Sequence, residues 1–431
     1  MVDVSYRPRL ADGQLKGLLR EIPAVMVTGL RAAGKTTTVR RLTADILRLD
    51  EPAVAAAVSA DPDAAIRRAR KPVLLDEWQE VPSVLGAVKR AVDEDPAPGR
   101  FLLTGSVEAD RSAQTWPGTG RIVRLVLHGL TQREIIGAVD TPGPLAAVLA
   151  GRVDDLRLPD DVPNLDGYVA LALRGGLPEP ALRLGAIGRQ AWVEAYLDHI
   201  VSRDVHALRG VRDPVRLRRY LEVLGLSTAG LPTDTTLYQA AGVDQRTADA
   251  YDYLLARLYV LDLLPAWSSN RLSRLVKRPK RYLADAALAV GAARVDEASV
   301  LLDGDLLGRV LDTFVAAQIR PEIPLLRPYA RLHHLRTQAG RQEIDLVIDL
   351  GAGRVAGIEI KAKSAPTAKD ARHLTWLREH LEDRFVAGIV FHTGPHPFPL
   401  GDRIWALPIC TLWSTATVPP TPAPAPEPRR A

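Results

Sequence analysis

A glycine-rich segment near the N-terminus carries the residue types that bind phosphate. It consists of Gly29, Leu30, Arg31, Ala32, Ala33, Gly34, Lys35, Thr36 and Thr37. It follows an apolar run at residues 25–27 and precedes a stretch with helical spacing. Glycines let backbone N–H groups turn toward a β-phosphate, and a helix N-terminus adds its positive dipole end. The pattern predicts that Lys35 bridges the β- and γ-phosphates of ATP and that the Thr36 hydroxyl binds Mg²⁺.

Two acidic residues downstream supply the expected partners of this segment. Asp76 and Glu77 follow the apolar run 73–75. A carboxylate at the end of such a strand lies beside the Mg²⁺ of a nucleotide, which is the role we assign to Asp76. Glu77 is then placed to orient and polarise the water that attacks the γ-phosphate. The order of the motifs predicts an ATP-hydrolysing site.

Three further polar residues are candidates for catalysis. The apolar run 101–103 ends in Thr104 and Ser106. Because the carboxyl ends of parallel strands face the ligand crevice, we expect one of them, Thr104 first, to sense the γ-phosphate or position water. The alternative is a capped turn with no catalytic role. Arg121 precedes the next apolar run, where it is a candidate to supply positive charge to the transferred phosphoryl group.

A second acidic cluster lies near the C-terminus. Asp345 precedes Glu359 and Lys361, with a glycine-containing turn at 351–353 between two strand-like runs. Asp345 and Glu359 on adjoining strands would hold Mg²⁺, and Lys361 would lie on the same face as Glu359 and orient water. This is the pattern of a metal-dependent nuclease. The alternative is a binding or regulatory module in which the carboxylates are relics.

The chain divides into three regions that must position these residues. Residues 1–165 alternate apolar strand-like runs with helical spacing, which predicts an α/β domain with a parallel sheet covered on both faces. The predicted strands are 24–28, 45–49, 73–75, 101–104 and 122–127. Residues 166–294 are helical, and residues 295–413 return to an α/β pattern. The proline-rich segment 414–431 is predicted to be a disordered tail.

The middle region contains helix-turn-helix spacing and two basic stretches. Residues 236–248 predict a helix, a turn at Gly242 and a second helix capped by Asp244. The second helix is nearly neutral, so packing or protein contact stands beside DNA reading as its role. Residues 203–219 and 271–281 are rich in arginine and lysine and predict contacts with nucleic-acid phosphates, the alternative being a solvated face.

The amino-acid composition excludes several classes of protein, such as disulfide-bonded and membrane-spanning proteins. The 431 residues carry a formal net charge of +5, which leans toward an anionic partner such as nucleic acid. The single cysteine, Cys410, excludes an internal disulfide and a zinc site built from several thiolates. No window approaches 18 consecutive apolar residues, and no apolar leader follows the N-terminal arginines. We expect a cytoplasmic protein that does not bind a membrane.

The sequence resembles the bacterial AAA+ ATP-binding proteins in which a P-loop domain precedes an uncharacterised C-terminal region. The likeness lies in residues 29–36, 76–77, 103–106, 120–121, 130–134, 175–179, 195–204, 306–317 and 359–361. It implies an AAA+ ATPase core, a winged-helix middle domain and a restriction-endonuclease-like C-terminal domain. It also places Asp312 at the remaining acidic position of the metal site, where related sequences usually have glutamate. AAA+ cores often assemble in rings, so a homo-oligomer is expected.

Two functional hypotheses follow. The first is an Mg²⁺-dependent ATPase whose nucleotide cycle drives or gates a nucleic-acid-directed, nuclease-like C-terminal domain. The second is a nucleotide-dependent switch or scaffold that binds a protein partner and carries an inert nuclease-like domain. A DNA-binding regulator whose middle domain reads sequence is a third possibility.

Overall fold

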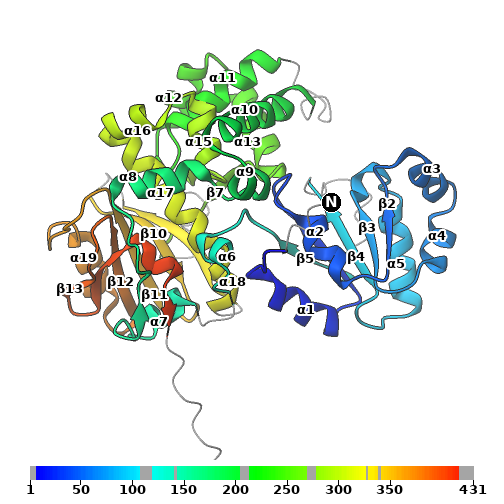
Figure 1. The fold of residues 1–431 in the computed structure, drawn as a ribbon, viewed down its shortest axis with the longest axis horizontal. Coiled ribbons are helices and arrows are strands. Elements are labelled where there is room, and N and C mark those ends of the chain that lie inside the picture. Colours follow the sequence, from blue (N-terminus) through cyan, green and yellow to red (C-terminus); the bar gives the residue numbers. More distant parts are fainter. Residues whose placement is uncertain are drawn as a thin grey trace, which may run out of the picture.

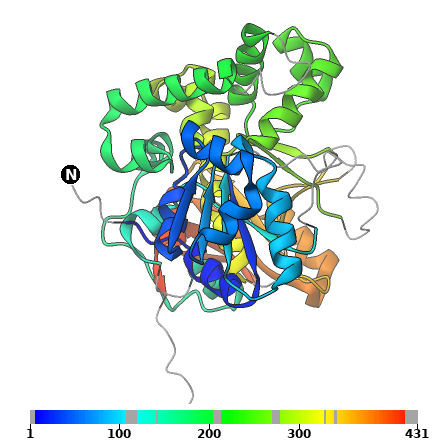
Figure 2. The same ribbon diagram turned by 90° about the vertical axis from the view of Figure 1, so that its right-hand side faces the viewer.

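Two sheets on opposite sides of the molecule organise the chain. The computed structural model describes residues 6–106, 119–139, 143–203, 213–268, 278–326, 329–337 and 341–416. In Figure 1 the N-terminal sheet lies on the right, the C-terminal sheet on the left and the helices of the middle region along the top. Figure 2 shows the N-terminal sheet and its helices in front of the rest of the chain.

The N-terminal sheet is parallel, as the alternating pattern predicts. It contains β1 (Ala24–Thr28), β2 (Asp45–Arg48), β3 (Val73–Asp76), β4 (Phe101–Gly105) and β5 (Ile122–Val126), in the order β2-β3-β4-β1-β5. Every residue of β1, β3 and β4 is buried, because helices cover both faces. One face packs against α1 (Ala11–Glu21) and α2 (Lys35–Val39). The other packs against α3 (Pro52–Ala60), α4 (Pro62–Arg68) and α5 (Val84–Glu94).

The chain leaves the N-terminal domain earlier than the predicted boundary at residue 165. After α6 (Gln132–Ile136), the segments α7 (Pro144–Leu149), β6 (Leu156–Arg157) and α8 (Leu165–Arg174) follow. Leu145, Val148 and Tyr168 of α7 and α8 belong to one apolar core with residues of the C-terminal sheet and its helix. The boundary prediction is corrected, since these apolar side chains find their partners in the C-terminal domain.

The middle region has the helix-turn-helix that the spacing predicts. After α8, its helices are α9 (Pro178–Arg183), α10 (Ala186–Arg203), α11 (Pro214–Leu226), α12 (Asp234–Ala241), α13 (Gln245–Arg257) and α15 (Ala286–Ala293), and α16 (Glu297–Leu302) follows at the start of the C-terminal region. Gly242 ends α12 with a φ of 66°, and the Asp244 side chain caps α13 by accepting from the Thr247 N–H. The antiparallel pair β7 (Leu261–Leu264) and β8 (Lys280–Leu283) follows α13.

The C-terminal domain is a mixed sheet with one long helix on each face. The strands are β9 (Arg331–Arg336), β10 (Glu343–Asp349), β11 (Val355–Lys361), β12 (Phe385–His392), β13 (Phe398–Gly401) and β14 (Ile404–Pro408), in the order β13-β14-β12-β11-β10-β9. The long helix α17 (Gly304–Ile319), followed by η4 (Arg320–Glu322) and α18 (Ile323–Leu326), packs on one face. The opposite face packs against α19 (Arg372–Leu381).

The predicted tail begins within this domain. Ser414 is buried, and β15 (Thr415–Ala416) pairs antiparallel with β6. The rest of the predicted disordered tail, residues 417–431, lies outside the described residues. Within the described ranges, no helix is long and apolar enough to cross a membrane.

Candidate functional site

The loop between β1 and α2 has the backbone of a phosphate-binding turn. Gly34 precedes α2 with φ 90° and ψ 22°, a left-handed conformation that favours glycine. A Cβ on Gly29 would lie 2.1 Å from the backbone oxygen of Leu127, so only glycine fits beside the end of β5. These two positions explain why the loop needs glycine at its two ends.

Lys35 is held inside this loop. Its side chain is buried, and its Nζ donates to the backbone oxygens of Gly29 at 3.1 Å and Leu30 at 3.0 Å. Burial lowers the pKa of Lys35 to about 8, against a smaller opposite effect of Glu77. A phosphate that contacts this ammonium would add negative charge beside it and offset the cost of its burial.

Two predicted hydroxyl groups bond one carboxylate oxygen of a third predicted residue at the carboxyl edge of the sheet. The Thr36 hydroxyl donates to Oδ1 of Asp76 at 2.8 Å, and the Thr104 hydroxyl bonds the same oxygen. Asp76 is only 6% exposed. The hydroxyls of Thr28 and Ser106, at the ends of β1 and β4, are buried without a hydrogen-bond partner within the described ranges. This oxygen-rich edge, with unsatisfied hydroxyls, fits Mg²⁺ and a phosphate group.

Glu77 is fixed in a strained conformation next to this carboxylate. Its backbone is left-handed, with φ 54° and ψ 52°, which is uncommon for a side chain of this kind. Its Oε2 accepts a hydrogen bond from Nε2 of Gln79 at 2.5 Å. Gln79 was not predicted from the sequence, because its role depends on the turn after β3.

Arg121 does not belong to the nucleotide site of its own chain. It precedes β5, whose first residue, Ile122, pairs with Ala24 at the amino end of β1. The phosphate loop follows the carboxyl end of β1, at the opposite edge of the sheet. The Arg121 Nε bonds Asp93 of α5 at 2.9 Å on the surface. Its predicted catalytic role is therefore wrong within one chain.

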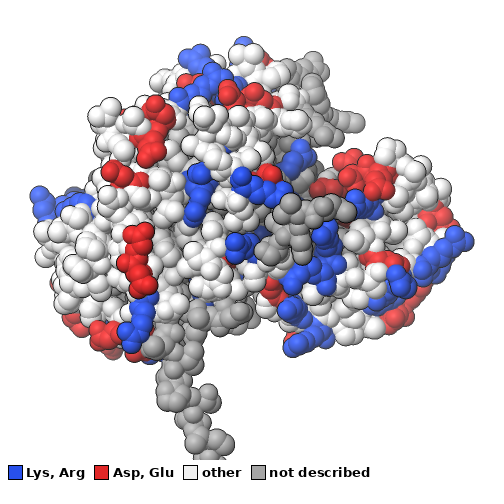
Figure 3. All heavy atoms as spheres, in the orientation of Figure 1, with Lys and Arg blue, Asp and Glu red and all other residues white. Residues whose placement is uncertain are grey.

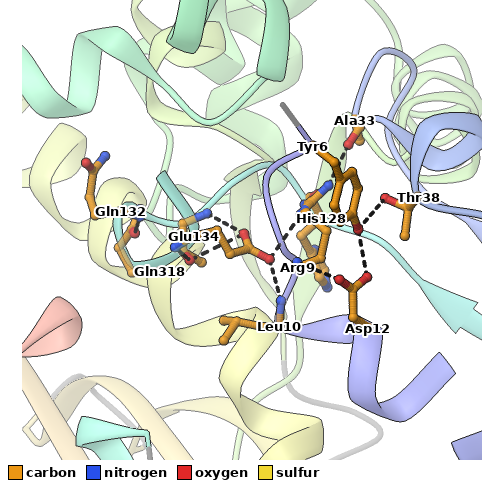
Figure 4. Close-up of polar contacts among 11 residues, drawn as sticks. Tyr6, Arg9, Leu10, Asp12, Ala33, Thr38, His128, Gln132, Glu134 and Gln318 are labelled. Carbon is orange, nitrogen blue, oxygen red and sulfur yellow. Dashed lines mark hydrogen bonds and ion pairs between the residues drawn. The ribbon is translucent and has the colours of Figure 1, made fainter. Parts of the chain in front are cut away.

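Arg9 is a buried residue of the loop that sequence reasoning missed. Its guanidinium donates to the backbone oxygen of Ala33 at 2.9 Å and to that of His128 at 2.7 Å. Its Nε bonds Glu134 of α6 at 3.0 Å, and both side chains are less than 5% exposed. Figure 4 shows this guanidinium between the phosphate loop and α6. Arg9 thus links the loop backbone to the first segment beyond the sheet.

Helix α6 continues this connection toward the C-terminal domain. Thr131 and Glu134 form a reciprocal capping box at its N-terminus. The Gln132 N–H donates to the side-chain oxygen of Gln318 at 2.7 Å. Arg133 forms a buried ion pair with Glu322 at 2.7 Å. One short helix therefore contacts both the N-terminal domain and α17 with its following turn, as Figure 1 shows by its central position.

The middle region also contacts the phosphate loop. The Tyr196 hydroxyl of α10 donates to the backbone oxygen of Arg31 at 3.2 Å. Leu130 donates its N–H to the Gly176 oxygen at 2.5 Å. A Cβ on Gly176 would lie 2.4 Å from the Leu130 oxygen, which explains why glycine stands there.

The C-terminal acidic residues meet around a lysine from the middle region. Asp312 of α17, Asp345 of β10 and Glu359 of β11 lie around the ammonium groups of Lys280 and Lys361. The Lys280 Nζ lies 2.6 Å from Oδ2 of Asp312 and 3.6 Å from Oδ1 of Asp345. Lys361 lies 2.6 Å from Glu359. Within the described ranges, no group of three or more His, Cys, Asp or Glu side chains is arranged to hold a metal.

Most cations in the described parts of the basic stretches form ion pairs. Lys280 faces Asp312, Arg281 bonds Asp252 at 2.9 Å, and Arg278 lies 3.6 Å from Asp234. In the other stretch, Arg216 pairs with Asp213 and Arg218 with Asp198. On the face in Figure 3, positive and negative side chains are interspersed. The prediction that Lys280 and Arg281 contact phosphates is wrong, because both side chains are buried.

The remaining residues of the two basic stretches, 204–212 and 271–277, lie outside the described residues.

Comparison with known proteins assigns the family. An uncharacterized protein of Mycobacterium tuberculosis and one of Mycobacterium bovis are each 31% identical to this chain over 417 residues, covering 95% of this chain and 85% of each relative. The chain belongs to their family. The AAA domain family matches residues 21–136, and two domains of unknown function, DUF8612 and DUF4143, match residues 165–299 and 307–412.

Solved structures with partial likeness include two archaeal proteins. The Walker-type ATPase of Pyrococcus abyssi has 15% identity and a TM-score of 0.39, covering 66% of this chain and 94% of its own. The ORC2 protein of Aeropyrum pernix has 15% identity and a TM-score of 0.33, covering 74% of this chain and 97% of its own. The family match and the parallel sheet make residues 21–136 an AAA-type P-loop domain, which is a nucleotide-binding fold.

The predicted phosphate contact of Lys35 can be tested through the pH dependence of nucleotide binding. We expect ATP affinity to fall as pH rises from 8 to 10, by up to about tenfold per pH unit, because the predicted contact uses the protonated Lys35 and its pKa is about 8. Fluorescent-nucleotide titrations at pH 7, 8, 9 and 9.5 measure this. Lys35→Met should bind weakly and show no such fall. A wild-type affinity that stays flat up to pH 9.5 would refute the assignment.

Proposed function

We propose that this chain hydrolyses ATP with Mg²⁺ in its AAA domain. Lys35 would contact the β- and γ-phosphates, and Thr36 and Asp76 would hold the Mg²⁺. Glu77, held by Gln79, would orient the attacking water, and Thr104 would fix the Asp76 carboxylate. When bound, Mg²⁺ would neutralise charge that develops on the phosphate oxygens.

The convergence of Thr36 and Asp76 carries this proposal. These residues are 40 positions apart in sequence, and their oxygens lie 2.8 Å apart directly after the phosphate loop. A threonine hydroxyl beside a buried carboxylate offers oxygen ligands of the kind that Mg²⁺ prefers. No other pair of predicted residues links the loop to the end of β3 so directly.

The test is the metal dependence of ATP turnover. Purified wild type should release phosphate from ATP with Mg²⁺ and stop in EDTA. Asp76→Asn should lower turnover about a hundredfold, because an amide holds the cation poorly. Asp93→Asn is the matched control, since Asp93 is an exposed aspartate that pairs with Arg121 at the far edge of the sheet. Equal turnover in Asp76→Asn and Asp93→Asn would contradict the proposal.

We further propose that the nucleotide state is transmitted to the C-terminal domain through α6. The support is the continuous set of contacts from the Ala33 backbone through Arg9 and Glu134 to α6, and from α6 to Gln318 and Glu322. A phosphate that moves the loop backbone would pull on the same guanidinium that holds α6. The winged-helix and restriction-endonuclease-like assignments for the other two domains rest on the sequence resemblance and remain proposals.

Of the two functional hypotheses, the geometry favours the nucleotide-dependent switch with a protein partner. The observation is that Lys280 occupies the acidic cluster and that most described cations of the basic stretches pair with aspartates. The nucleic-acid-directed ATPase predicts instead that DNA at low salt stimulates ATP turnover and that plasmid is nicked in Mg²⁺ or Mn²⁺. Stimulation and nicking that are both lost in Asp345→Ala and Lys361→Ala would reverse this preference. Cytoplasmic location and a homo-oligomer remain predictions.

A further inference from the structure

The acidic cluster of the C-terminal domain has its own internal cation. Lys280 comes from β8 of the middle region, whereas Asp312, Asp345 and Glu359 come from the C-terminal domain. The lysine side chain is 3% exposed, and its ammonium lies 2.6 Å from Asp312 and 3.6 Å from Asp345. An ammonium in contact with two carboxylates from different elements takes the place that a divalent cation takes in an acidic metal site.

Neighbouring groups hold the two carboxylates that face Lys280. The Tyr282 hydroxyl, on the same strand and the same side as Lys280, donates to the other oxygen of Asp312 at 2.9 Å. Asp345 is fixed from the opposite side, because its Oδ2 accepts from the Ile360 N–H at 2.9 Å. Both carboxylates are therefore oriented toward the ammonium by groups that do not depend on it.

One ligand atom of the cluster remains unsatisfied. Glu359 is 2% exposed, and its Oε1 has no hydrogen-bond partner within the described residues. Its Oε2 accepts from Lys361 at 2.6 Å. A buried carboxylate oxygen without a partner is costly, and a cation is the kind of ligand that would satisfy it.

Solvent ions can reach this cluster. A cleft of about 670 Å³ lies between α12 and the C-terminal domain, and its lining includes Asp312, Asp345 and Lys361. Lys280 is not among the lining residues, so it closes the cluster from behind rather than from the cleft. The Lys361 ammonium lies on the cleft side of the cluster, 3.9 Å from Asp345, and the Lys280 ammonium lies on its inner side.

We propose that the Lys280 ammonium occupies the cation position in the cluster of Asp312, Asp345 and Glu359 and thereby excludes divalent cations. The residues present do not fit Mg²⁺ in this arrangement, because a metal and an ammonium repel each other at such a distance. The middle region therefore keeps the nuclease-like centre closed. Withdrawal of β8, or removal of the lysine charge, would let the carboxylates of Asp312, Asp345 and Glu359 rearrange around a divalent cation.

The test is Mn²⁺ binding to the full chain without nucleotide, so that its outcome does not depend on ATP hydrolysis. Lys280→Met keeps the length of the side chain and removes the charge. We expect it to bind one additional Mn²⁺ at least about tenfold more tightly than wild type, as measured by electron paramagnetic resonance of the free ion. The double variant Lys280→Met/Asp345→Asn should lose this site.

Lys363→Met is the matched control, because Lys363 is an exposed lysine close to the cluster that pairs with Asp370 at 2.5 Å. It should bind Mn²⁺ as wild type does. Removing Lys280 leaves the buried Asp312 carboxylate without its cation, so Lys280→Met is expected to melt at a lower temperature and to be stabilised by millimolar Mn²⁺. Either of two results overturns the proposal. One is a Lys280→Met protein that Mn²⁺ neither binds nor stabilises. The other is a wild type that binds Mn²⁺ equally well through Asp345.

Discussion

Lys35→Met is expected to lower ATP turnover at least about a thousandfold while leaving the fold at least as stable as wild type. The loss follows from the position of the ammonium inside the phosphate loop, where its Nζ lies 3.1 Å and 3.0 Å from two loop carbonyls. A preorganised cation in a buried site stabilises the charge of the transferred phosphoryl group far more than water does. Methionine has a similar length and no charge.

The expected stability of Lys35→Met follows from the lowered pKa of Lys35. Burial lowers it from the ordinary 10.5 to about 8, so the folded chain holds the ammonium less readily than the unfolded chain. Below pH 8 this difference destabilises the fold by an amount on the order of 3 kcal/mol, and the cost disappears as pH rises toward 10.5. Methionine removes that cost but also removes two hydrogen bonds, each worth about 1 kcal/mol.

Phosphate release and urea unfolding at pH 7 measure the two halves separately. Lys16→Met, a change in α1 away from the loop, is the matched lysine control and should retain turnover. If Lys35→Met lost turnover only because it unfolded, its urea midpoint would drop well below that of wild type. If it kept turnover, the phosphate-contacting role of Lys35 would be wrong.

Local patterns in the sequence predicted the parts of the fold that local patterns determine. The apolar runs of β1 and β4 are recognisable because parallel strands are buried on both faces. By contrast, β9 reads Arg-Leu-His-His-Leu-Arg and has no apolar run, and β13 and β14 contain Pro399 and Pro408; none of the three was predicted. The helical spacing after the phosphate loop gives a helix that stops at Val39 and continues as a 3₁₀ turn, η1 (Arg40–Leu42).

The site residues also divide into those that a short sequence motif predicts and those whose partners are distant in the sequence. Lys35, Thr36 and Asp76 were predictable because each sits in a short motif, whereas Arg9 and Lys280 act on partners far along the chain. Arg9 and Glu134 are 125 positions apart, and Lys280 and Asp345 are 65 apart. The run of cations around Lys280 predicted phosphate contact. The prediction failed because a local sequence pattern does not show which distant aspartates lie opposite these cations. Arg121 failed for a related reason, since spacing alone does not tell which end of a strand a residue occupies.

Arg9→Met is expected to destabilise the chain by about 3–5 kcal/mol and to weaken ATP binding. Its guanidinium is the charged partner of the buried Glu134, and removing one member of a buried ion pair leaves the other charge uncompensated. The carbonyls of Ala33 and His128 also lose their donor. Because Ala33 belongs to the phosphate loop, the loop backbone loses its anchor as well. Urea unfolding and a nucleotide titration measure the two effects.

Arg7→Met is the matched control, since Arg7 lies two residues away and is exposed. Its unfolding free energy should stay within about 0.5 kcal/mol of wild type. Glu134 keeps the N–H donors of Leu10 and Thr131 at 2.8 Å and 2.7 Å, so Glu134→Gln in the Arg9→Met background should restore part of the stability. A coupling energy of about 1–3 kcal/mol in this double-mutant cycle would establish the pair. If Arg9→Met unfolds like Arg7→Met, Arg9 neither anchors the loop nor holds α6, and transmission through α6 loses its first contact.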